Sequence, residues 1–496
     1  MDYNYDACLN RFSQSQNKIM KSDELFIDTN KKSPFKNILI VGLGKSGISS
    51  AQYLAKFKNF FGNKISISVY DKFKSIDKQK SLLKGLEIDN FHTGIFEARM
   101  CKQNSLIVLS PGINPNEVIC DGMVVNDIFL FLDYLKRISS HLTQIKIVGI
   151  TGTNGKTTTC YFLEHLMKSA DLAVYTAGNI GNSPLDLIDN LKEKDTVILE
   201  LSSFQLRLFI DIPFPRKLDI GILLNITPDH LDIHENMDEY FNSKKALLYN
   251  SERTIVNIDL GEDFVEEFND ITLNCNSYSP DNLKKSNSLV SYDLINENDE
   301  KYIQDNQGFS VPISKLKIPG EHNVFNVMAS IAVLKCYEIK FNDYEKAFSS
   351  FQGIAHRMEW IKNINDVDYF NDSKGTNVAS TNAALACFGD KRIILIAGGD
   401  VKNQNLLPLK GSIKNNVKAL ILIGRDAHIF MENFKDIDCI EIVICESMKE
   451  AVTKAYRLAN QGEVVLLSPA SASLDMYSNY IERGNHFKEI VNQIIL

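Results

Sequence analysis

Several kinds of segment are missing from this chain of 496 residues. No apolar run approaches the roughly 20 residues that a membrane-spanning helix needs, and the polar residues 1–36 lack the apolar core of a signal peptide. The nine cysteines include no C-x-x-C pair, so neither a disulfide framework nor a zinc site is indicated. The 54 basic and 62 acidic residues leave a net charge of -8, which argues against a general nucleic-acid binder. We therefore expect a cytoplasmic protein with reduced thiols that binds neither membrane nor nucleic acid.

The length suggests about three domains at roughly 150 residues each, and an apolar fraction of 44% is enough for each to bury a core. Short β-branched apolar runs alternate with helical patterns in three blocks, which predicts α/β domains with parallel sheets. We predict a Rossmann-like N-terminal domain at 37–142, a central domain at 143–352 and a Rossmann-like C-terminal domain at 353–496. Residues 1–36 are expected to be a disordered polar extension. Ligands of such sheets bind at the carboxyl ends of strands, so the residues after strands are the candidates.

The most informative motif is T-G-T-N-G-K-T-T at 151–158, between an expected strand and an expected helix from about Lys156. Glycines let backbone N–H groups approach phosphate oxygens, and the helix N-terminus adds its positive dipole end. Lys156 can reach the β- and γ-phosphates, and Thr157 can bind Mg²⁺. The motif is shorter than G-x-x-x-x-G-K-[ST], which needs glycine where Ile150 stands. A solvated lysine in an ordinary turn is the alternative, but strand, loop and helix come in the right order. We therefore predict a central ATP-binding domain of P-loop type.

Polar residues also follow the next strands of the central block. Glu200 ends one strand, where a nucleotide site has a Mg²⁺ ligand, although a lone glutamate is more often a cap or an ion-pair partner. His230 ends the following strand, and its position makes a functional role as probable as a structural one. Lys244 and Lys245 lie on an expected helix, and the pattern alone selects neither as functional.

Together these segments resemble the Mur ligase family, the ATP-dependent amide-forming enzymes of peptidoglycan synthesis. The resemblance runs from about residue 37 to the C-terminus and is carried in the central block by 149–158, 200–205 and 320–326. In the third block, 371–381 and 467–475, followed by Tyr480 and 483–485, are similar to the branch that adds D-glutamate.

The resemblance implies that ATP phosphorylates the carboxylate of UDP-N-acetylmuramoyl-L-alanine. The amine of D-glutamate then displaces phosphate from the acyl phosphate, which leaves ADP and phosphate as products. It further implies two Mg²⁺ ions and a lysine carbamylated by CO₂. The positions that match catalytic residues are Lys156, Lys244, His230 and Asn179. Those that match metal ligands are Thr157, Glu200, His230 and the carbamate of Lys244. Because Lys245 lies about 100° further around the helix, only one of the two lysines should face the site.

The same resemblance implies three sets of substrate contacts. For ATP they are Gly152, Thr153, Asn154, Gly155, Lys156, Thr157, Thr158, Asn326, Arg357, Asp372 and Lys374. For the UDP-sugar they are Ser46, Asp71, Ser110, Gly112 and Asn179, and for the amino acid Thr376, Lys402, Ser473 and Tyr480. A lysine and hydroxyls suit a dicarboxylate. Three positions depart from the family: Tyr480 and Leu406 stand where Phe is commoner, and Asn405 where an acid is common. We expect small-molecule partners only, and a monomer.

Three alternatives remain at this level. The G-L-G-K-S-G segment at 42–47, with Asp71 after the next strand, is also the pattern of an NAD-dependent oxidoreductase, which would leave the ATP loop unused. Another Mur ligase or a folylpolyglutamate-type ligase would use the same mechanism with a different amine. A non-catalytic scaffold would not need the phosphate loop, the metal ligands and Lys374 together.

Overall fold

The structure is a computed structural model that describes most of the chain. The described ranges are 35–58, 65–73, 75–101, 105–114, 117–118, 122–137, 142, 144–210, 212–227, 234–268, 270–274, 290–297, 300–318, 320–339, 343–351, 353–389, 392–401 and 404–494. The predicted extension at 1–36 lies almost wholly outside them, as do His230 and Lys402. The chain divides into two compact units, one made chiefly of Met1–Asn274 and the other chiefly of Phe341–Leu496. Each unit is described by itself.

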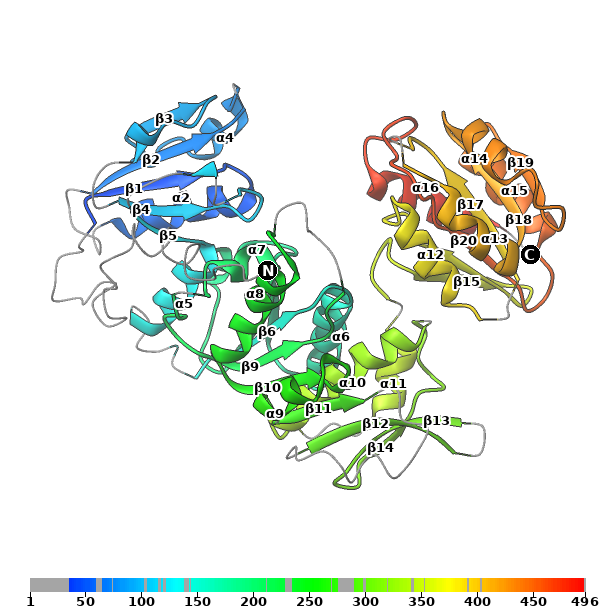
Figure 1. Ribbon diagram of the computed structural model, residues 1–496, viewed down its shortest axis with the longest axis horizontal. Coiled ribbons are helices and arrows are strands. Elements are labelled where there is room, and N and C mark those ends of the chain that lie inside the picture. Colours follow the sequence, from blue (N-terminus) through cyan, green and yellow to red (C-terminus); the bar gives the residue numbers. More distant parts are fainter. Residues whose placement is uncertain are drawn as a thin grey trace, which may run out of the picture. The chain divides into compact units, whose positions relative to one another are not determined.

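The described part of the N-terminal domain is a five-stranded parallel sheet in the order β3-β2-β1-β4-β5 (Figure 1). Its strands are β1 (Asn37–Val41), β2 (Ser66–Asp71), β3 (Asn90–Thr93), β4 (Ser105–Leu109) and β5 (Gly122–Val125). Its helices are α2 (Lys45–Lys56), α4 (Asp77–Leu82) and α5 (Asp127–Arg137), with a 3-10 turn at Ala98–Met100. β4 is buried along its whole length and β1 along all but its first residue, as expected for a parallel sheet with both faces covered.

Within the described residues, the central domain builds a sheet of nine strands in the order β14-β13-β12-β11-β10-β9-β6-β8-β7. These are β6 (Lys146–Thr151), β7 (Val174–Gly178), β8 (Thr196–Glu200), β9 (Leu218–Leu223), β10 (Ser251–Asn257), β11 (Ile271–Asn274), β12 (Val290–Glu297), β13 (Glu300–Asp305) and β14 (Ser310–Pro312). Strands β6 to β11 are paired in parallel, whereas β13 and β14 are antiparallel.

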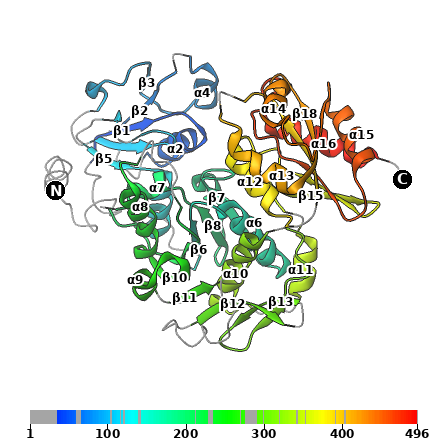
Figure 2. The ribbon, with the colours of Figure 1, turned by 45° about the vertical axis from the view of Figure 1, so that its right-hand side comes forward.

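Helices of the central domain cover this sheet, and α6 lies along β6, β7 and β8 (Figure 2). They are α6 (Lys156–Ser169), α7 (Ser203–Arg207), α8 (Met237–Tyr249), α9 (Glu262–Glu267), α10 (Glu321–Cys336) and α11 (Tyr344–Ser350), with 3-10 turns at Pro184–Leu187 and Ile258–Leu260. The described part of the polar stretch 262–310 holds the short helix α9 and strands β11 to β13.

A sheet of six strands, in the order β15-β16-β20-β17-β18-β19, forms the described part of the C-terminal domain. Its strands are β15 (Glu359–Ile364), β16 (Val367–Asn371), β17 (Ile393–Gly398), β18 (Val417–Ile423), β19 (Glu441–Ile444) and β20 (Val464–Leu467). Its helices are α12 (Val378–Ala386), α13 (Lys410–Asn416), α14 (Ala427–Phe434), α15 (Met448–Leu458) and α16 (Tyr480–Gln493), with a 3-10 turn at Leu407–Leu409. Only β15 runs antiparallel, to β16. The predicted α/β fold of three sheet domains is confirmed.

The N-terminal and central domains share a core within the first unit. The ring of Phe129 on α5 stacks on Phe209, with centroids 6.3 Å apart and planes 5° apart. Asn126, at the start of α5, donates from Nδ2 to the Gln205 carbonyl at 3.0 Å. Both residues are almost fully buried. Buried hydrogen bonds and aromatic packing of this kind fix the two domains against each other.

One expectation about cysteine is wrong: Cys101 is disulfide-bonded. Among the other described cysteines, Cys160, Cys336, Cys387, Cys439 and Cys445 are free. The lack of a spacing pattern in the sequence therefore does not exclude a single disulfide. Among the described helices, none combines the length and apolar character required to span a membrane.

Candidate active site

The phosphate loop connects β6 to α6 as predicted, and its glycines have conformations that other residues rarely adopt. Gly152 has φ 154° and Gly155, the residue before α6, has φ 82°. Asn225, which follows β9, holds the loop from the neighbouring strand. Its side chain accepts from the Asn154 N–H at 2.9 Å and donates to the Asn154 carbonyl at 3.1 Å. No motif in the sequence singles out Asn225, although it stands two residues beyond the end of β9.

Two lysines converge on one carbonyl oxygen of this loop. Lys156 donates from Nζ to the carbonyls of Gly152 and Thr153, both at 2.8 Å. Lys244, from the middle of α8, donates from Nζ to the same Gly152 oxygen at 2.8 Å. Lys244 is 1% exposed, and its Nζ lies 4.6 Å from the centroid of the Tyr240 ring. The Tyr240 hydroxyl is in turn 2.9 Å from Thr153 Oγ1.

The adjacent Lys245 has a different environment. Its Nζ pairs with Glu267 Oε2 at 2.6 Å on the outer side of α8. The helix therefore directs only one of the two lysines at the phosphate loop, which is what the rotation of about 100° per residue predicted.

Glu200, at the end of β8, has both carboxylate oxygens engaged. Thr157 donates from Oγ1 to Oε2 at 2.8 Å, and Asn179 donates from Nδ2 to Oε1 at 2.9 Å. Gly178 makes this approach possible, because a Cβ there would lie 2.4 Å from the Glu200 carbonyl oxygen. The carboxylate is 2% exposed, so these two hydrogen bonds orient it rigidly.

The residues around Glu200 fit a Mg²⁺ ion bound to ATP. A hydroxyl and one carboxylate are the oxygen ligands that Mg²⁺ takes from such sites, while water and phosphate oxygens complete the octahedron. No group of three or more His, Cys, Asp or Glu side chains with the arrangement of a metal site occurs among the described residues.

At the carboxyl edge of the N-terminal sheet, polar groups order the first glycine loop. Asp71 Oδ2 accepts from the Leu43 N–H at 2.7 Å, and Ser110 donates from Oγ to the Gly42 carbonyl at 2.7 Å. Gly112 lies exposed in the turn after β4. Gly47 is required for packing, since a Cβ there would lie 1.8 Å from the Gly42 carbonyl oxygen.

The glycine loop is also tied to the central domain. The Asp127 carboxylate accepts side-chain hydrogen bonds from Ser183 and Ser46. Lys45 donates from Nζ to the Gly181 carbonyl at 3.3 Å. Burial raises the pKa of Asp127. The loop that follows β7, which carries Asn179, is thus linked to the loop that carries Ser46.

In the C-terminal domain, Asp372 follows β16 and is almost fully buried. Ser468 donates from Oγ to Asp372 Oδ2 at 2.8 Å, and the Met358 N–H donates to Oδ1 at 3.3 Å. Burial raises the pKa of Asp372 to about 7, although these hydrogen bonds act to lower it. Arg357 is exposed nearby and also lowers this pKa through its charge. Asn326, on α10, donates from Nδ2 to Asn323 Oδ1 at 3.1 Å.

Three of the residues predicted for the amino acid, Thr376, Ser473 and Tyr480, lie on segments that Arg483 connects. Arg483 is 1% exposed, donates from Nε to Ser373 Oγ at 3.0 Å, and donates from Nη2 to the Ser373 and Ser471 carbonyls at 2.9 and 3.1 Å. Ser373 in turn donates from Oγ to the Tyr480 carbonyl at 2.8 Å. Ser473 is buried, Thr376 is half-buried, and Lys374 Nζ lies 5.6 Å from the centroid of the Tyr480 ring. Arg483 lies in the segment 483–485, which resembles the branch that adds D-glutamate, but the resemblance implied no role for this arginine.

Comparison with known proteins gives the class of the protein. Three family models match the chain: the MurD-like N-terminal domain of Mur ligases over 36–128, the Mur ligase middle domain over 150–334, and the Mur ligase glutamate ligase domain over 356–471. The chain therefore belongs to the Mur ligase family. Within that family it is of the MurD type, an ATP-dependent ligase of peptidoglycan synthesis.

Curated relatives carry one name, UDP-N-acetylmuramoylalanine--D-glutamate ligase. The protein from Coxiella burnetii is 33% identical over 92% of this chain and 98% of its own length. Those from Methylobacillus flagellatus and Christiangramia forsetii are 31% and 36% identical, each over 92% of this chain and over 97% and 100% of their own lengths.

Solved structures show the same fold at lower identity. The UDP-N-acetylmuramate-alanine ligase MurC of Thermotoga maritima matches with a TM-score of 0.52 and 17% identity over 92% of this chain and 99% of its own. The MurF ligase of the same organism, in complex with ADP, matches with a TM-score of 0.50 and 14% identity over 96% and 100%. The family membership rules out the oxidoreductase alternative, and Mur ligases use ATP and Mg²⁺.

Proposed function

We propose that this protein joins D-glutamate to UDP-N-acetylmuramoyl-L-alanine, with ATP converted to ADP and phosphate through an acyl phosphate. The observation that carries ATP-dependent ligation is the arrangement of Lys156, Thr157 and Glu200 at the carboxyl edge of the central sheet. The choice of D-glutamate rests on the relatives of that name and on Thr376, Ser473 and Tyr480 in the third domain.

The chemical problem is to bring two anions, a carboxylate and a triphosphate, into contact. Lys156 and the N-terminal end of α6 supply positive charge to the phosphates. Thr157 and Glu200 would hold a Mg²⁺ ion there, which would supply further charge neutralisation. Asn179 donates a hydrogen bond to Glu200 and would bind the UDP-sugar.

We assign Lys244 a covalent role as well. Its neutral amine would form an N–C bond to CO₂ and release one N–H proton, which gives a carbamate. This carboxylate-like group and His230 would hold a second Mg²⁺. Carbamylation consumes the neutral amine, and burial disfavours the charged ammonium form of a lysine. Lys244 is buried beside the phosphate loop, which suits this chemistry, whereas Lys245 is half-buried and paired with Glu267.

The remaining predicted residues keep their assignments in this proposal. Gly152 to Thr158, Asn326, Arg357, Asp372 and Lys374 bind ATP, and Ser46, Asp71, Ser110 and Gly112 bind the UDP-sugar. Lys402 joins Thr376, Ser473 and Tyr480 at the amino acid. The domain boundaries near 143 and 353, a monomeric state and a cytoplasmic location, where ATP is available, belong to the proposal too.

The test is phosphate release from ATP with UDP-N-acetylmuramoyl-L-alanine and one amino acid at a time. The panel is D-glutamate, L-glutamate, D-alanine, L-lysine and meso-diaminopimelate. We expect activity with D-glutamate only, and none from the Lys156→Ala variant used as the background control. Release with another amine and not with D-glutamate would move the protein to another branch of the family.

A further inference from the structure

Four loops meet at the carboxyl edge of the C-terminal sheet. They follow β16, β20, β17 and β18, which are consecutive neighbours in the sheet. The first loop carries Thr376 and the second carries Ser473, both assigned above to the amino acid. The loop after β17 begins at Gly399. The loop after β18, Gly424 to Asp426, has no role in the proposed reaction, yet it lies at the edge where ligands of such sheets bind.

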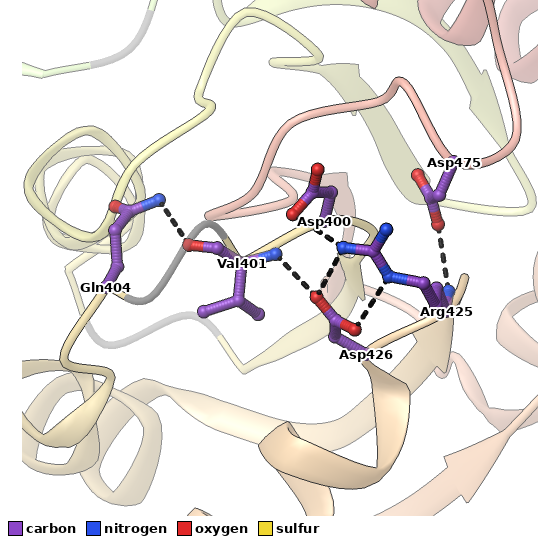
Figure 3. Close-up of polar contacts among 6 residues, drawn as sticks. All are labelled: Asp400, Val401, Gln404, Arg425, Asp426 and Asp475. Atoms are coloured by element: carbon purple, nitrogen blue, oxygen red, sulfur yellow. Dashed lines mark hydrogen bonds and ion pairs between the residues drawn. The ribbon is translucent and has the colours of Figure 1, made fainter.

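Arg425, in this last loop, contacts three acidic residues from three loops (Figure 3). Its Nη2 lies 2.8 Å from Asp400 Oδ1, and its Nε donates to Asp426 Oδ1 at 3.0 Å. Its backbone N–H donates to Asp475 Oδ2 at 2.8 Å. The Arg425 side chain remains 61% exposed, so it spans the loops from the solvent side.

The acidic partners in turn fix the loop after β17. Asp426 Oδ2 accepts from the Val401 N–H at 2.9 Å, as Figure 3 shows. Asp400 and Ala472 exchange two backbone hydrogen bonds, each of 2.9 Å. The loop after β17 is thus held to the loop after β20, which carries Ser473.

The Gln404 side chain connects the loop after β17 to the loop that carries Thr376. It donates from Nε2 to the Val401 carbonyl at 3.1 Å and to the Thr376 carbonyl at 3.4 Å. Arg425 therefore belongs to a continuous set of polar contacts that ends at the backbone of Thr376 on one side and next to Ser473 on the other.

Charge gives Arg425 a second effect. Three carboxylates, those of Asp400, Asp426 and Asp475, lie at an edge that has to accept an amino acid with two carboxylates of its own. The hydrogen bond from Arg425 holds the pKa of Asp426 below its usual range, so Asp426 is ionised at neutral pH. Without a cation between them, these aspartates would repel a dicarboxylate substrate.

We propose that Arg425 is a positioning and specificity-determining residue for the amino acid: it holds the Asp400 loop in place and offsets the negative charge of Asp400 and Asp426. The proposal rests on the proposed function, because it assumes that the acidic amino acid binds at this edge. An exposed ion pair contributes little to stability, so Arg425 can be changed without unfolding the domain.

The experiment compares the KM values of the three substrates in Arg425→Gln, Arg425→Lys and a matched control. Lys435→Gln is that control, since its side chain is also 61% exposed and pairs with Glu432 on a different part of the same domain. We expect Arg425→Gln to raise the KM for D-glutamate about tenfold or more, the scale of one lost charge-assisted contact. The KM values for ATP and the UDP-sugar and the midpoint of thermal unfolding should remain within twofold and a few degrees of wild type.

The other variants separate charge from geometry. Arg425→Lys keeps the charge but loses the planar fork, so its KM for D-glutamate should lie between wild type and Arg425→Gln. The double variant Asp400→Asn/Arg425→Gln removes one negative charge together with the positive one and should regain part of the lost affinity. Lys435→Gln should behave as wild type.

Three results would overturn the inference. The KM for D-glutamate could stay within twofold of wild type in Arg425→Gln, or all three KM values could rise together, as a merely structural role predicts. No recovery in the double variant would refute the charge effect. Wild-type protein that is inactive with D-glutamate but active with another amine would instead overturn the proposed function, so the two failures are distinguishable.

Discussion

Lys244 donates a hydrogen bond from its buried Nζ to the Gly152 carbonyl oxygen at 2.8 Å. This contact joins the middle of α8 to the phosphate loop, 92 residues earlier in the chain. Because Lys156 donates to the same oxygen, the loop has an amine on each side of it. Only the terminal amine of Lys244 reaches the phosphate loop, so any part that Lys244 plays in the chemistry depends on that amine.

The Lys244→Ala variant is accordingly expected to be folded and inactive. If the lysine acts as a carbamate, a small free carboxylic acid such as acetate should replace the missing ligand and restore part of the phosphate release. The control is Lys245→Ala, which removes a surface contact with Glu267 and should retain activity. Full activity of Lys244→Ala without added acid would remove this lysine from the metal site.

Lys156→Ala tests the phosphate loop itself. The side chain is partly buried at the first residue of α6, where a cation stabilises bound phosphates and contributes little to the helix. We expect loss of phosphate release by at least about a hundredfold, as for one lost electrostatic contact to the transition state. Circular dichroism and thermal unfolding should match wild type. A folded variant with near-normal turnover would refute the assignment of this loop to ATP.

Two substitutions of Thr157 distinguish a role of its hydroxyl in metal binding from a role of its side chain in packing. Thr157→Val keeps the shape and removes the donor to Glu200, whereas Thr157→Ser keeps the hydroxyl. A hydrogen bond to a charged group is worth about 1.5–3 kcal/mol. The valine variant should therefore need about tenfold or more Mg²⁺ for half-maximal phosphate release, and the serine variant should resemble wild type. An identical Mg²⁺ dependence in both variants would show that the hydroxyl is not a ligand.

Gly47 and Gly44, both in the glycine loop at 42–47, provide a matched pair of substitutions for a test of folding stability. A Cβ on Gly47 would overlap the Gly42 carbonyl oxygen, whereas a Cβ on Gly44 meets nothing within 4 Å. Gly47→Ala should cost about 3 kcal/mol of folding free energy or more, because backbone must move to admit the methyl group. Gly44→Ala should be nearly neutral. Calorimetry of both variants, together with the KM for the UDP-sugar, measures this; equal stabilities would contradict the close contact.

Much of the fold was predictable because strands buried on both faces leave apolar runs. The apolar runs at 36–41, 106–109 and 464–467 form β1, β4 and β20 to within one residue at their starts, and α6 begins at Lys156 as expected. Strands such as β3 and β19 were missed. Both are edge strands with exposed residues. β3 carries no continuous apolar run, and the apolar run in β19 is only three residues long, Ile442 to Ile444.

The candidate site was predictable to a different degree. Glu200 at a strand end and Thr157 in the phosphate-loop motif could be selected from the sequence. Arg425 and Asn225 also follow strands, but nothing in the sequence singles them out, because their roles come from contacts between loops that are distant in sequence. Leu406, which stands where the family more often has Phe, is a buried core residue, so this departure affects packing of the loop and not a polar contact.

Asp372 provides a prediction about pH. Burial raises its pKa to about 7 from the ordinary 3.8, so the folded state holds a proton that the unfolded state has released between these values. The unfolded state then binds fewer protons, and stability must fall as pH rises through this window, by up to about 1.4 kcal/mol per pH unit. Below about pH 4 both states are protonated, and above about pH 7 the loss is complete.

Asp372→Asn removes this titration while it keeps a side chain of similar shape. The free energy of unfolding of the variant relative to wild type should therefore increase from pH 5 to about pH 7 and then level off towards pH 8. The only tryptophan in the chain, Trp360, lies on β15 and reports on this domain by fluorescence during denaturant unfolding. Because the Ser468 hydrogen bond lowers the Asp372 pKa, Ser468→Ala should shift the pH-dependent loss to higher pH. A difference between Asp372→Asn and wild type that is constant over this range would show that Asp372 has the same protonation in both states.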